Sequence, residues 1–356
     1  MQFEHTPPEA RELLAKPIRS LGLRLEGTPL EKLVQQLYSE LAARGLGKFR
    51  PGVYLSDEWA CPDREPVIGI PFYLADPKLA ALERAINDIE DEREILMYLR
   101  HEAGHAFNYA YLLYETKEWL DLFGPFDRPY DERYTPVPFS RKYVRHIAGW
   151  YAQKHPDEDF AETFAVWLTP TGGAGSAGDG RSPQGGASND WRHRYARWPA
   201  LKKLQYVERV ARDLRETPPR KALEIAVREL PVEEMADTVE QFYRQHEAEE
   251  AATLADLLPD AELEDIFTRR RNGDADVRPA AAFLQEHRKA IVDKIAYWTG
   301  LRRPMVKKLV ELIGKRSREL DLCVERSKET QALVEVVAFA TTLAMNYLTR
   351  GQFAEK

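Results

Sequence analysis

The chain has 356 residues, of which 44% are hydrophobic and 31% charged, so it can build a sizeable core and does not have the composition of a disordered protein. Its net charge of −7 argues against general nucleic-acid binding, which needs a basic surface. The two cysteines, Cys61 and Cys323, are too few for a disulfide framework or a four-cysteine zinc site.

The N-terminal part of the chain predicts one helix, a small sheet and a second, long helix. Apolar residues between positions 30 and 41 recur at steps of three and four, as on an amphipathic helix. Two runs rich in β-branched and aromatic residues, 53–55 and 67–75, predict strands, and Pro71 places the second strand at a sheet edge. Such an edge could bind an extended peptide by strand addition or could simply be protected by its proline. Residues 91–115 predict one long buried helix.

The middle of the chain alternates loops and helices. A loop rich in Pro and Tyr occupies about 124–139, and a second apolar helix is predicted from about 157 to 168. Residues 171–190 consist mostly of Gly, Ser and Ala, which predicts a flexible surface insertion. Helical spacing returns at 191–214, where the aromatic residues are expected to pack the segment against the preceding domain.

A boundary at Pro218-Pro219 divides the chain into two predicted domains, 1–218 and 219–356. The second shows only helical patterns and is expected to be an all-α domain, so the fold class is α+β and predominantly helical, with a small sheet in the first domain. The apolar stretch 332–348 is marginal in length for a membrane span, and the N-terminus lacks the apolar run of a secretory signal. We therefore expect a cytoplasmic protein without a membrane segment.

The most informative motif is Arg100-His101-Glu102-Ala103-Gly104-His105. Two histidines four residues apart project from one helix face, so both imidazoles can converge on one ion, and Glu102 can take a proton from a metal-bound water. The flanking residues are apolar on nearly every side, which is typical of a buried helix. Burying these polar groups without partners costs several kcal/mol, a cost that a cation would relieve. The simpler alternative is a pair of hydrogen-bonded core histidines.

A catalytic zinc site has three protein ligands and one open position. Asn108 and Tyr111 stand where a metzincin would need Gly and His, which excludes that class. The best candidates for the third ligand are Glu158 and Glu162, four residues apart on the second apolar helix. We assign Glu158 as the ligand and Glu162 as the carboxylate that orients a bound histidine, while the reverse assignment stays open.

The helix dipole can explain the other acidic residues in the first turn of that helix, Asp157 and Asp159, because negative charge is favourable there. It does not explain Glu162, which lies a full turn deeper among aromatic residues.

HEAGH followed by EDFAETF resembles the gluzincin metallopeptidases, which bind zinc through two histidines and one glutamate. The longer stretch 145–168 resembles a bacterial family of zinc-binding metallo-peptidases, and the likeness covers about 60–215. The resemblance implies a zincin-like domain that binds Zn²⁺ and hydrolyses peptide bonds with Glu102 as general base. The glutamate motif also resembles that of the toxin lethal factor, where a tyrosine seven residues before the ligand assists at the oxyanion. This implies the same role for Tyr151.

Four other residues are candidates for the same cleft. His146 and His155 flank Tyr151, and we expect them to be loop or capping histidines because they lack the helical pairing of the motif. Tyr130 and Tyr134 are rival oxyanion donors, although a tyrosine in a Pro-rich loop is more often a packing residue.

Two classes of function follow from these patterns. The first is a zinc metallopeptidase acting on a peptide or protein substrate, with no nucleic acid or membrane as partner. The second is a helical interaction or regulatory protein with a structural or degenerate zinc site, favoured by the long helical region without a catalytic motif. In a variant of the first, the C-terminal helices or the Gly-rich insertion cover the active-site cleft until a protein partner binds. Substrate identity, endo- or exopeptidase action and oligomeric state have no signature in the sequence.

Overall fold

The structure is a computed structural model that describes residues 8–86, 89–131, 134–170, 190–224, 228–250, 260–269 and 276–350. Contacts divide the chain into two compact units, and each has its own hydrophobic core. Unit 1 comprises Met1–Tyr134, Phe139–Ile147 and Tyr151–Glu247, and unit 2 comprises Thr135–Pro138, Ala148–Trp150 and Ala248–Lys356. The predicted insertion 171–190 lies outside the described residues except for its last position.

In the described residues, two α-helices of unit 1 precede its sheet, α1 (Pro8–Leu14) and α2 (Pro29–Ala43), and α3 (Pro77–Ile86) comes after the sheet. Helix α2 covers the predicted amphipathic segment, and its apolar stripe is buried in the core of unit 1. The prediction of a helix at 30–41 is therefore confirmed.

A small parallel sheet follows, made of β1 (Gly52–Ser56) and β2 (Val67–Pro71). Gly69 in β2 also pairs with Ala60 on its other side, and the Gly69 N–H donates to the Ala60 carbonyl at 2.7 Å. After Pro71 the chain turns into a short 3₁₀ helix, Phe72–Ala75, so the predicted strand is too long. All five residues of β2 are buried and Gly69 has partners on both sides, which argues against strand addition at this residue.

Helix α4 (Glu92–Tyr111) is the long buried helix that carries the histidine motif. Asp91 caps its N-terminus and forms a capping box with Glu94, which satisfies backbone N–H groups that the helix itself leaves unpaired. The helix ends at Leu112, whose φ of 54° is left-handed. A short 3₁₀ helix, Leu113–Glu115, occupies the rest of the predicted segment.

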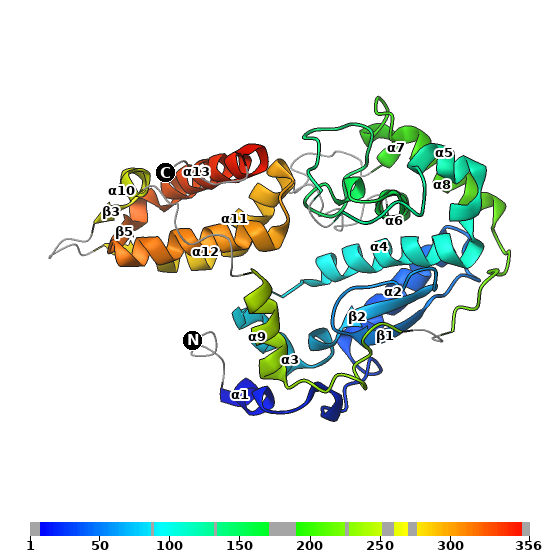
Figure 1. The fold of residues 1–356 in the computed structure, drawn as a ribbon, viewed down its shortest axis with the longest axis horizontal. Coiled ribbons are helices and arrows are strands. Elements are labelled where there is room, and N and C mark those ends of the chain that lie inside the picture. The colour runs from blue at the N-terminus through cyan, green and yellow to red at the C-terminus, as the bar shows by residue number, and fades with distance from the viewer. Residues whose placement is uncertain are drawn as a thin grey trace. The chain divides into compact units, whose positions relative to one another are not determined.

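The other α-helices in the described part of unit 1 are α5 (Lys117–Phe123), α6 (Pro156–Leu168), α7 (Trp191–Arg194), α8 (Leu201–Asp213) and α9 (Val239–Glu250), which reaches past the end of the unit at Glu247. Helix α4 lies between the sheet with α2 on one side and α6 on the other (Figure 1). Trp191 and Tyr195 are buried in the core of unit 1, as the aromatic pattern predicts. The motif helix is thus enclosed from two sides.

The segment after α8 returns to unit 1, whereas the sequence suggested a boundary at residue 218. The Gly52 N–H donates to the Leu223 carbonyl at 2.9 Å, and the Val232 N–H donates to the Leu55 carbonyl at 3.0 Å. These bonds join the segment to the backbone of β1, so unit 1 extends to Glu247. The division into a metallopeptidase domain, 1–218, and a C-terminal domain, 219–356, stays a prediction.

Unit 2 consists mainly of α10 (Asp260–Ile266), α11 (Ala280–Thr299), α12 (Arg303–Glu319) and α13 (Glu329–Arg350). It also contains an antiparallel sheet in the order β3 (Thr268–Arg269), β5 (Leu322–Glu325) and β4 (Val277–Pro279). The α+β, predominantly helical class is confirmed, but the prediction of an all-α C-terminal region is wrong. These strands have two to four residues, too few to show a two-residue period in the sequence.

One helical segment of the described chain, Arg326–Thr349, is long and apolar enough to cross a bilayer by length and composition, and 28% of its most apolar window is buried. Core helices of water-soluble proteins pass the same test, so this finding carries little weight. The expectation of a protein without a membrane segment stays a prediction.

Candidate metal centre

Helices α4 and α6 approach each other so closely that a glycine is required between them. A Cβ atom on Gly104 would lie 2.7 Å from the Ala161 Cα and 2.9 Å from its carbonyl oxygen. Real Cβ contacts are essentially never that short, so any larger residue would push the helices apart. This close approach brings the two histidines of α4 opposite the acidic first turns of α6.

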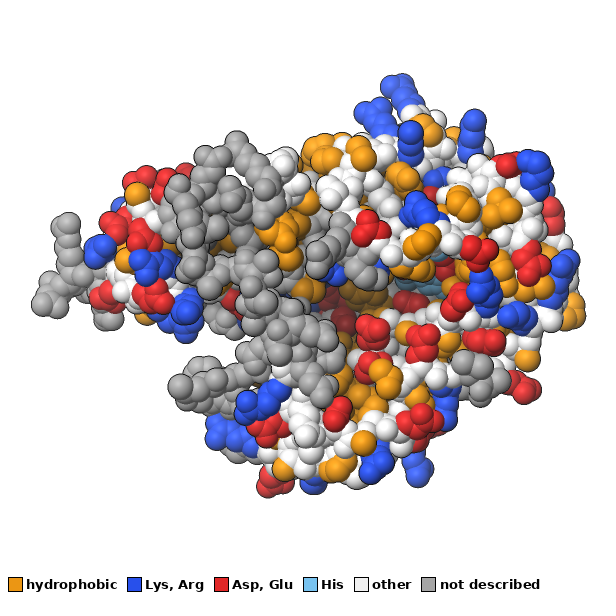
Figure 2. Space-filling model, in the orientation of Figure 1, with side chains coloured by type: hydrophobic (Ala, Val, Ile, Leu, Met, Phe, Trp, Pro, Cys, Tyr) orange, Lys and Arg blue, Asp and Glu red, His pale blue; other side chains and the backbone are white. Residues whose placement is uncertain are grey.

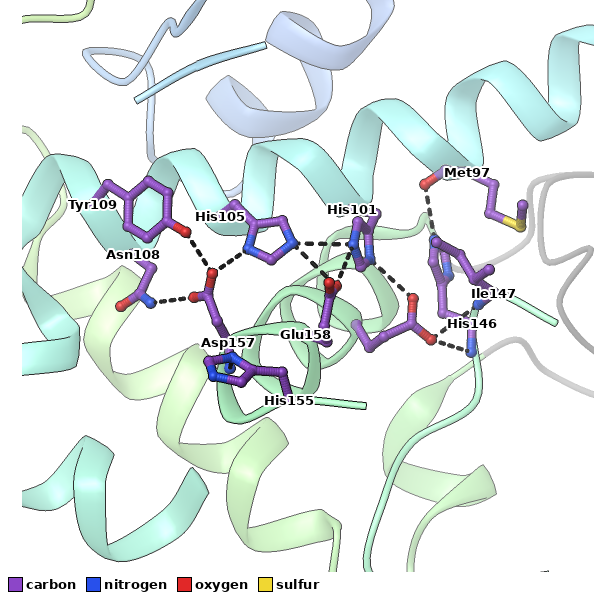
Figure 3. A network of polar contacts seen from close by, with 11 residues as sticks. Met97, His101, His105, Asn108, Tyr109, His146, Ile147, His155, Asp157 and Glu158 are labelled. Atoms are coloured by element: carbon purple, nitrogen blue, oxygen red, sulfur yellow. Dashed lines mark hydrogen bonds and ion pairs between the residues drawn. The ribbon is translucent and has the colours of Figure 1, made fainter. Parts of the chain in front are cut away.

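Three side-chain atoms meet at this crossing. His101 Nε2 lies 3.0 Å from Glu158 Oε2, His105 Nε2 lies 3.2 Å from the same oxygen, and the two Nε2 atoms are 3.1 Å apart (Figure 3). Two ligands of a tetrahedral zinc with bonds of about 2.0–2.1 Å are separated by about 3.3 Å. The three atoms therefore form a triangle of nearly the right size for one zinc ion, and all three residues are buried.

The other nitrogen of each ring is directed at a second carboxylate. His101 Nδ1 lies 3.0 Å from Glu162 Oε1, and His105 Nδ1 lies 2.6 Å from Asp157 Oδ2. An Nδ1–H that donates to a carboxylate leaves the Nε2 lone pair for a metal. Glu162 thus contacts Nδ1 of His101, whereas Glu158 contacts the Nε2 atoms of both histidines. This arrangement favours Glu158 over Glu162 as the third ligand.

Glu162 is held in turn by the main chain. Its Oε2 accepts hydrogen bonds from the backbone N–H groups of His146 at 3.1 Å and Ile147 at 2.9 Å. The carboxylate is fully buried, so these bonds supply the partners that water would otherwise provide.

Asp157 was not expected to take part in the site, because its place in the first turn of α6 already had an explanation in the helix dipole. In the structure it accepts hydrogen bonds from Asn108 Nδ2 at 2.7 Å and from the Tyr109 hydroxyl at 2.5 Å, besides its contact with His105 (Figure 3). A signal was present in the sequence: Asn108 and Tyr109 follow His105 by three and four residues, on the same helix face.

The acidic surroundings favour positive charge on the two rings. Burial opposes the charge on His101, but the hydrogen bonds to Glu158 and Glu162 outweigh it and raise the pKa of His101 to about 9. Burial likewise opposes the charge on His105, but Asp157 favours that charge. The pKa of His105 is therefore raised well above its ordinary value. Burial also opposes ionisation of Glu158, but the two histidines lower its pKa. Such a site attracts a cation, because one ion can replace the protons on both rings.

Glu102 follows His101 on α4, and its charge interacts with those of His101, His105 and Glu158. Burial raises its pKa, partly offset by the nearby charges of His101 and His105. In the described part of the chain its carboxylate forms no hydrogen bond or ion pair with another side chain. The carboxylate is therefore available to a water molecule.

Two tyrosines border the same acidic groups. The Tyr151 ring lies 5.6 Å from the His101 ring, and burial together with Glu158 raises the pKa of Tyr151 well above its usual value. Tyr130 stacks on His155 at 3.9 Å between ring centroids, and its pKa is raised in the same way. Both phenols therefore keep their protons at neutral pH and can donate hydrogen bonds.

The two flanking histidines have structural partners. Burial lowers the pKa of His146 to about 4, and its Nε2 donates to the Met97 carbonyl at 2.9 Å. His155 caps α6: its Nδ1 accepts from the Asp157 N–H, and its Nε2 donates to the Arg128 carbonyl at 2.6 Å. Both agree with the loop and capping roles expected from the sequence.

Histidine side chains remain visible from outside, in a hollow on one face that is bordered by acidic side chains (Figure 2).

Comparison with known proteins bears on the segment that contains these residues. No curated protein and no solved structure matches the chain. Residues 65–178 match the sequence model of a family described as "Putative zinc-binding metallo-peptidase". This range includes α4 and α6, and hence His101, His105 and Glu158, whose side chains could hold the zinc for which the family is described. Residues 65–178, about a third of the chain, are thus similar to this family of zinc-binding metallo-peptidases.

Proposed function

We propose that the protein is a zinc-dependent metallopeptidase of the gluzincin type, in which His101, His105 and Glu158 bind the metal. The observation that supports this most directly is the triangle of two Nε2 atoms and one carboxylate oxygen, with both Nδ1 atoms turned to other carboxylates. Zinc held there would polarise a substrate carbonyl and lower the pKa of a bound water to about 7. Glu162 and Asp157 would orient the two rings.

In this proposal Glu102 is the general base. Its carboxylate takes a proton from the attacking water and then delivers that proton to the leaving amine. Burial raises its pKa, which helps it hold the proton between the two steps.

Tyr151 is the proposed hydrogen-bond donor to the oxyanion. Its position beside the His101 ring and its raised pKa support this role. A well-placed donor of this kind contributes about 3–4 kcal/mol to transition-state stabilisation. Tyr130, whose pKa burial and the charge of Glu158 also raise, is the rival donor.

The proposed substrate is a peptide or protein, and the proposed location is the cytoplasm. The net charge of −7 supports the proposal that nucleic acid is not a partner. A structural or degenerate zinc site remains the alternative. It predicts zinc binding without hydrolysis.

The full-length protein, loaded with zinc, should cleave members of a peptide library, and a chelator should stop the cleavage. Glu102→Gln should keep its zinc but lose hydrolysis by about 10²–10⁴-fold, because it removes the base without removing a ligand. Glu233→Gln, at an exposed glutamate of unit 1, is the matched control and should cleave as the parent does. Undiminished hydrolysis in Glu102→Gln would contradict the mechanism, and zinc binding with no chelator-sensitive cleavage would favour the structural alternative.

A further inference from the structure

We propose that Tyr109 and Asn108 are positioning residues of the metal site, which act through Asp157 to fix the ring of His105. The inference rests on the proposed function only in taking His105 as a metal ligand. It does not depend on peptide hydrolysis.

Asp157 is the point at which the three α4 residues meet. The carboxylate is 1% exposed, and its Oδ2 accepts from the Tyr109 hydroxyl at 2.5 Å while lying 2.6 Å from His105 Nδ1 (Figure 3). Its Oδ1 accepts from Asn108 Nδ2 at 2.7 Å. Positions 105, 108 and 109 are three and four residues apart, so one face of the helix presents all three donors to one carboxylate.

The hydrogen bonds to Asp157 determine which tautomer and orientation of the His105 imidazole the metal meets. Asn108 contacts Oδ1 of Asp157 and Tyr109 contacts Oδ2, so the carboxylate is held with Oδ2 facing His105 Nδ1, whose N–H can donate to it. The Nε2 lone pair of His105 then faces the position shared with His101 and Glu158. The two donors also fix the carboxylate in space, so the ring cannot rotate without breaking bonds.

Water cannot replace these donors if they are removed. Tyr109 is 3% exposed and Asn108 is 0% exposed. Loss of either donor would therefore leave a carboxylate oxygen of Asp157 short of a partner in a buried site.

The two carboxylates that contact the Nδ1 atoms of the histidines are held by different kinds of donor. Glu162, which contacts His101, is held by the backbone N–H groups of His146 and Ile147, whereas Asp157 is held by side chains. A substitution can remove a side-chain donor but not a backbone N–H group. Substitutions on α4 can therefore change how Asp157, and through it the His105 ring, is held.

Tyr111 provides a matched control on the same helix. It is also 3% exposed, and its hydroxyl donates to the Thr217 carbonyl at 2.9 Å, away from Asp157. Tyr111→Phe removes a hydroxyl of similar burial without touching the metal centre. Any effect on the fold alone should therefore be similar in the two Tyr→Phe variants.

The test measures the zinc dissociation constant of the full-length protein by competition with a chromophoric chelator, and the unfolding midpoint of the metal-free protein. Substituting a residue that hydrogen-bonds to a metal ligand typically weakens metal binding 10–100-fold. Tyr109 and Asn108 contact Asp157 and not the ligand itself, so we expect a smaller effect. Tyr109→Phe and Asn108→Leu should each weaken zinc binding about three- to tenfold, while Tyr111→Phe should stay within about twofold. Tyr109→Phe removes a single oxygen, so it keeps the test decisive if Asn108→Leu does not fold.

A double variant tests whether Tyr109 acts through Asp157. In an Asp157→Ala background, Tyr109→Phe should weaken zinc binding no further, because the carboxylate that links it to His105 is gone. Equal zinc affinity in Tyr109→Phe and Tyr111→Phe, or an undiminished effect in the Asp157→Ala background, would overturn the inference. Zinc binding that follows this pattern in a chain that cleaves no peptide would contradict the proposed function and leave the inference standing.

Discussion

At the scale of single residues, each histidine of the site has one nitrogen directed at a carboxylate and the other directed at the shared position. His101 contacts Glu162 and His105 contacts Asp157 through Nδ1. The sequence predicted the pair of histidines and two candidate glutamates, because spacing on a helix determines which side chains share a face. Asp157 was missed: Asn108 and Tyr109 share a helix face with His105, but that pattern does not say which acidic residue, about fifty positions later in the chain, they contact.

Glu158→Ala and Tyr151→Phe separate the ligand from the proposed oxyanion donor. The first should lower zinc content strongly, because it removes one of the three atoms of the triangle. The second should keep its zinc but lower kcat, by up to 10²–10³-fold if the hydroxyl is well placed. Metal analysis of the two purified variants, together with their kinetics, checks this. Equal zinc retention in both would contradict the ligand assignment.

At the scale of secondary-structure elements, the site depends on the contact between α4 and α6. Both helices were predicted from their apolar patterns, but the end of α4 at Leu112 was not, since a left-handed residue other than glycine leaves little trace in a sequence. The short strands of unit 2 were missed for a related reason: two to four residues are too few to show a period.

Gly104→Ala should weaken zinc binding and lower the unfolding free energy, although alanine is intrinsically the better helix former by about 1 kcal/mol. The added Cβ would meet the backbone of Ala161 and separate the helices that carry the ligands. Overpacking of this kind costs about 1–3 kcal/mol. Thermal unfolding and chelator competition measure the two effects.

Gly314→Ala in α12 is the control for this substitution. There the added Cβ would lie 3.9 Å from Leu284 Cδ1, which is ordinary contact, so the variant should be as stable as the parent or more stable. Equal behaviour of the two variants would contradict the role of Gly104.

At the scale of the whole molecule, the metal site links stability to pH. The pKa of His101 is about 9 in the metal-free fold, against 6.5 in an unfolded chain, and that of His105 is shifted in the same direction. Between these pH values the folded protein binds more protons than the unfolded chain, so its free energy of unfolding falls as pH rises. Below pH 6.5 the full stabilisation from these two groups is present.

Metal-free protein should therefore lose stability between pH 6.5 and 9, by on the order of 3 kcal/mol from His101. The zinc-loaded protein should not show this loss, because metal-bound imidazoles carry no exchangeable ring proton at Nε2. Denaturant unfolding at several pH values, with and without a chelator, checks both statements. Constant or rising stability of the metal-free protein over this range would contradict the charge balance of the site.

The central claim is that one zinc ion binds to His101, His105 and Glu158. X-ray absorption at the zinc edge of the purified, zinc-reconstituted protein, combined with elemental analysis, tests it most directly. We predict one zinc per chain in a shell of two imidazole nitrogens and carboxylate or water oxygens, and loss of one imidazole from that shell in His105→Ala. Absence of bound zinc, or an unchanged shell in His105→Ala, would contradict the claim.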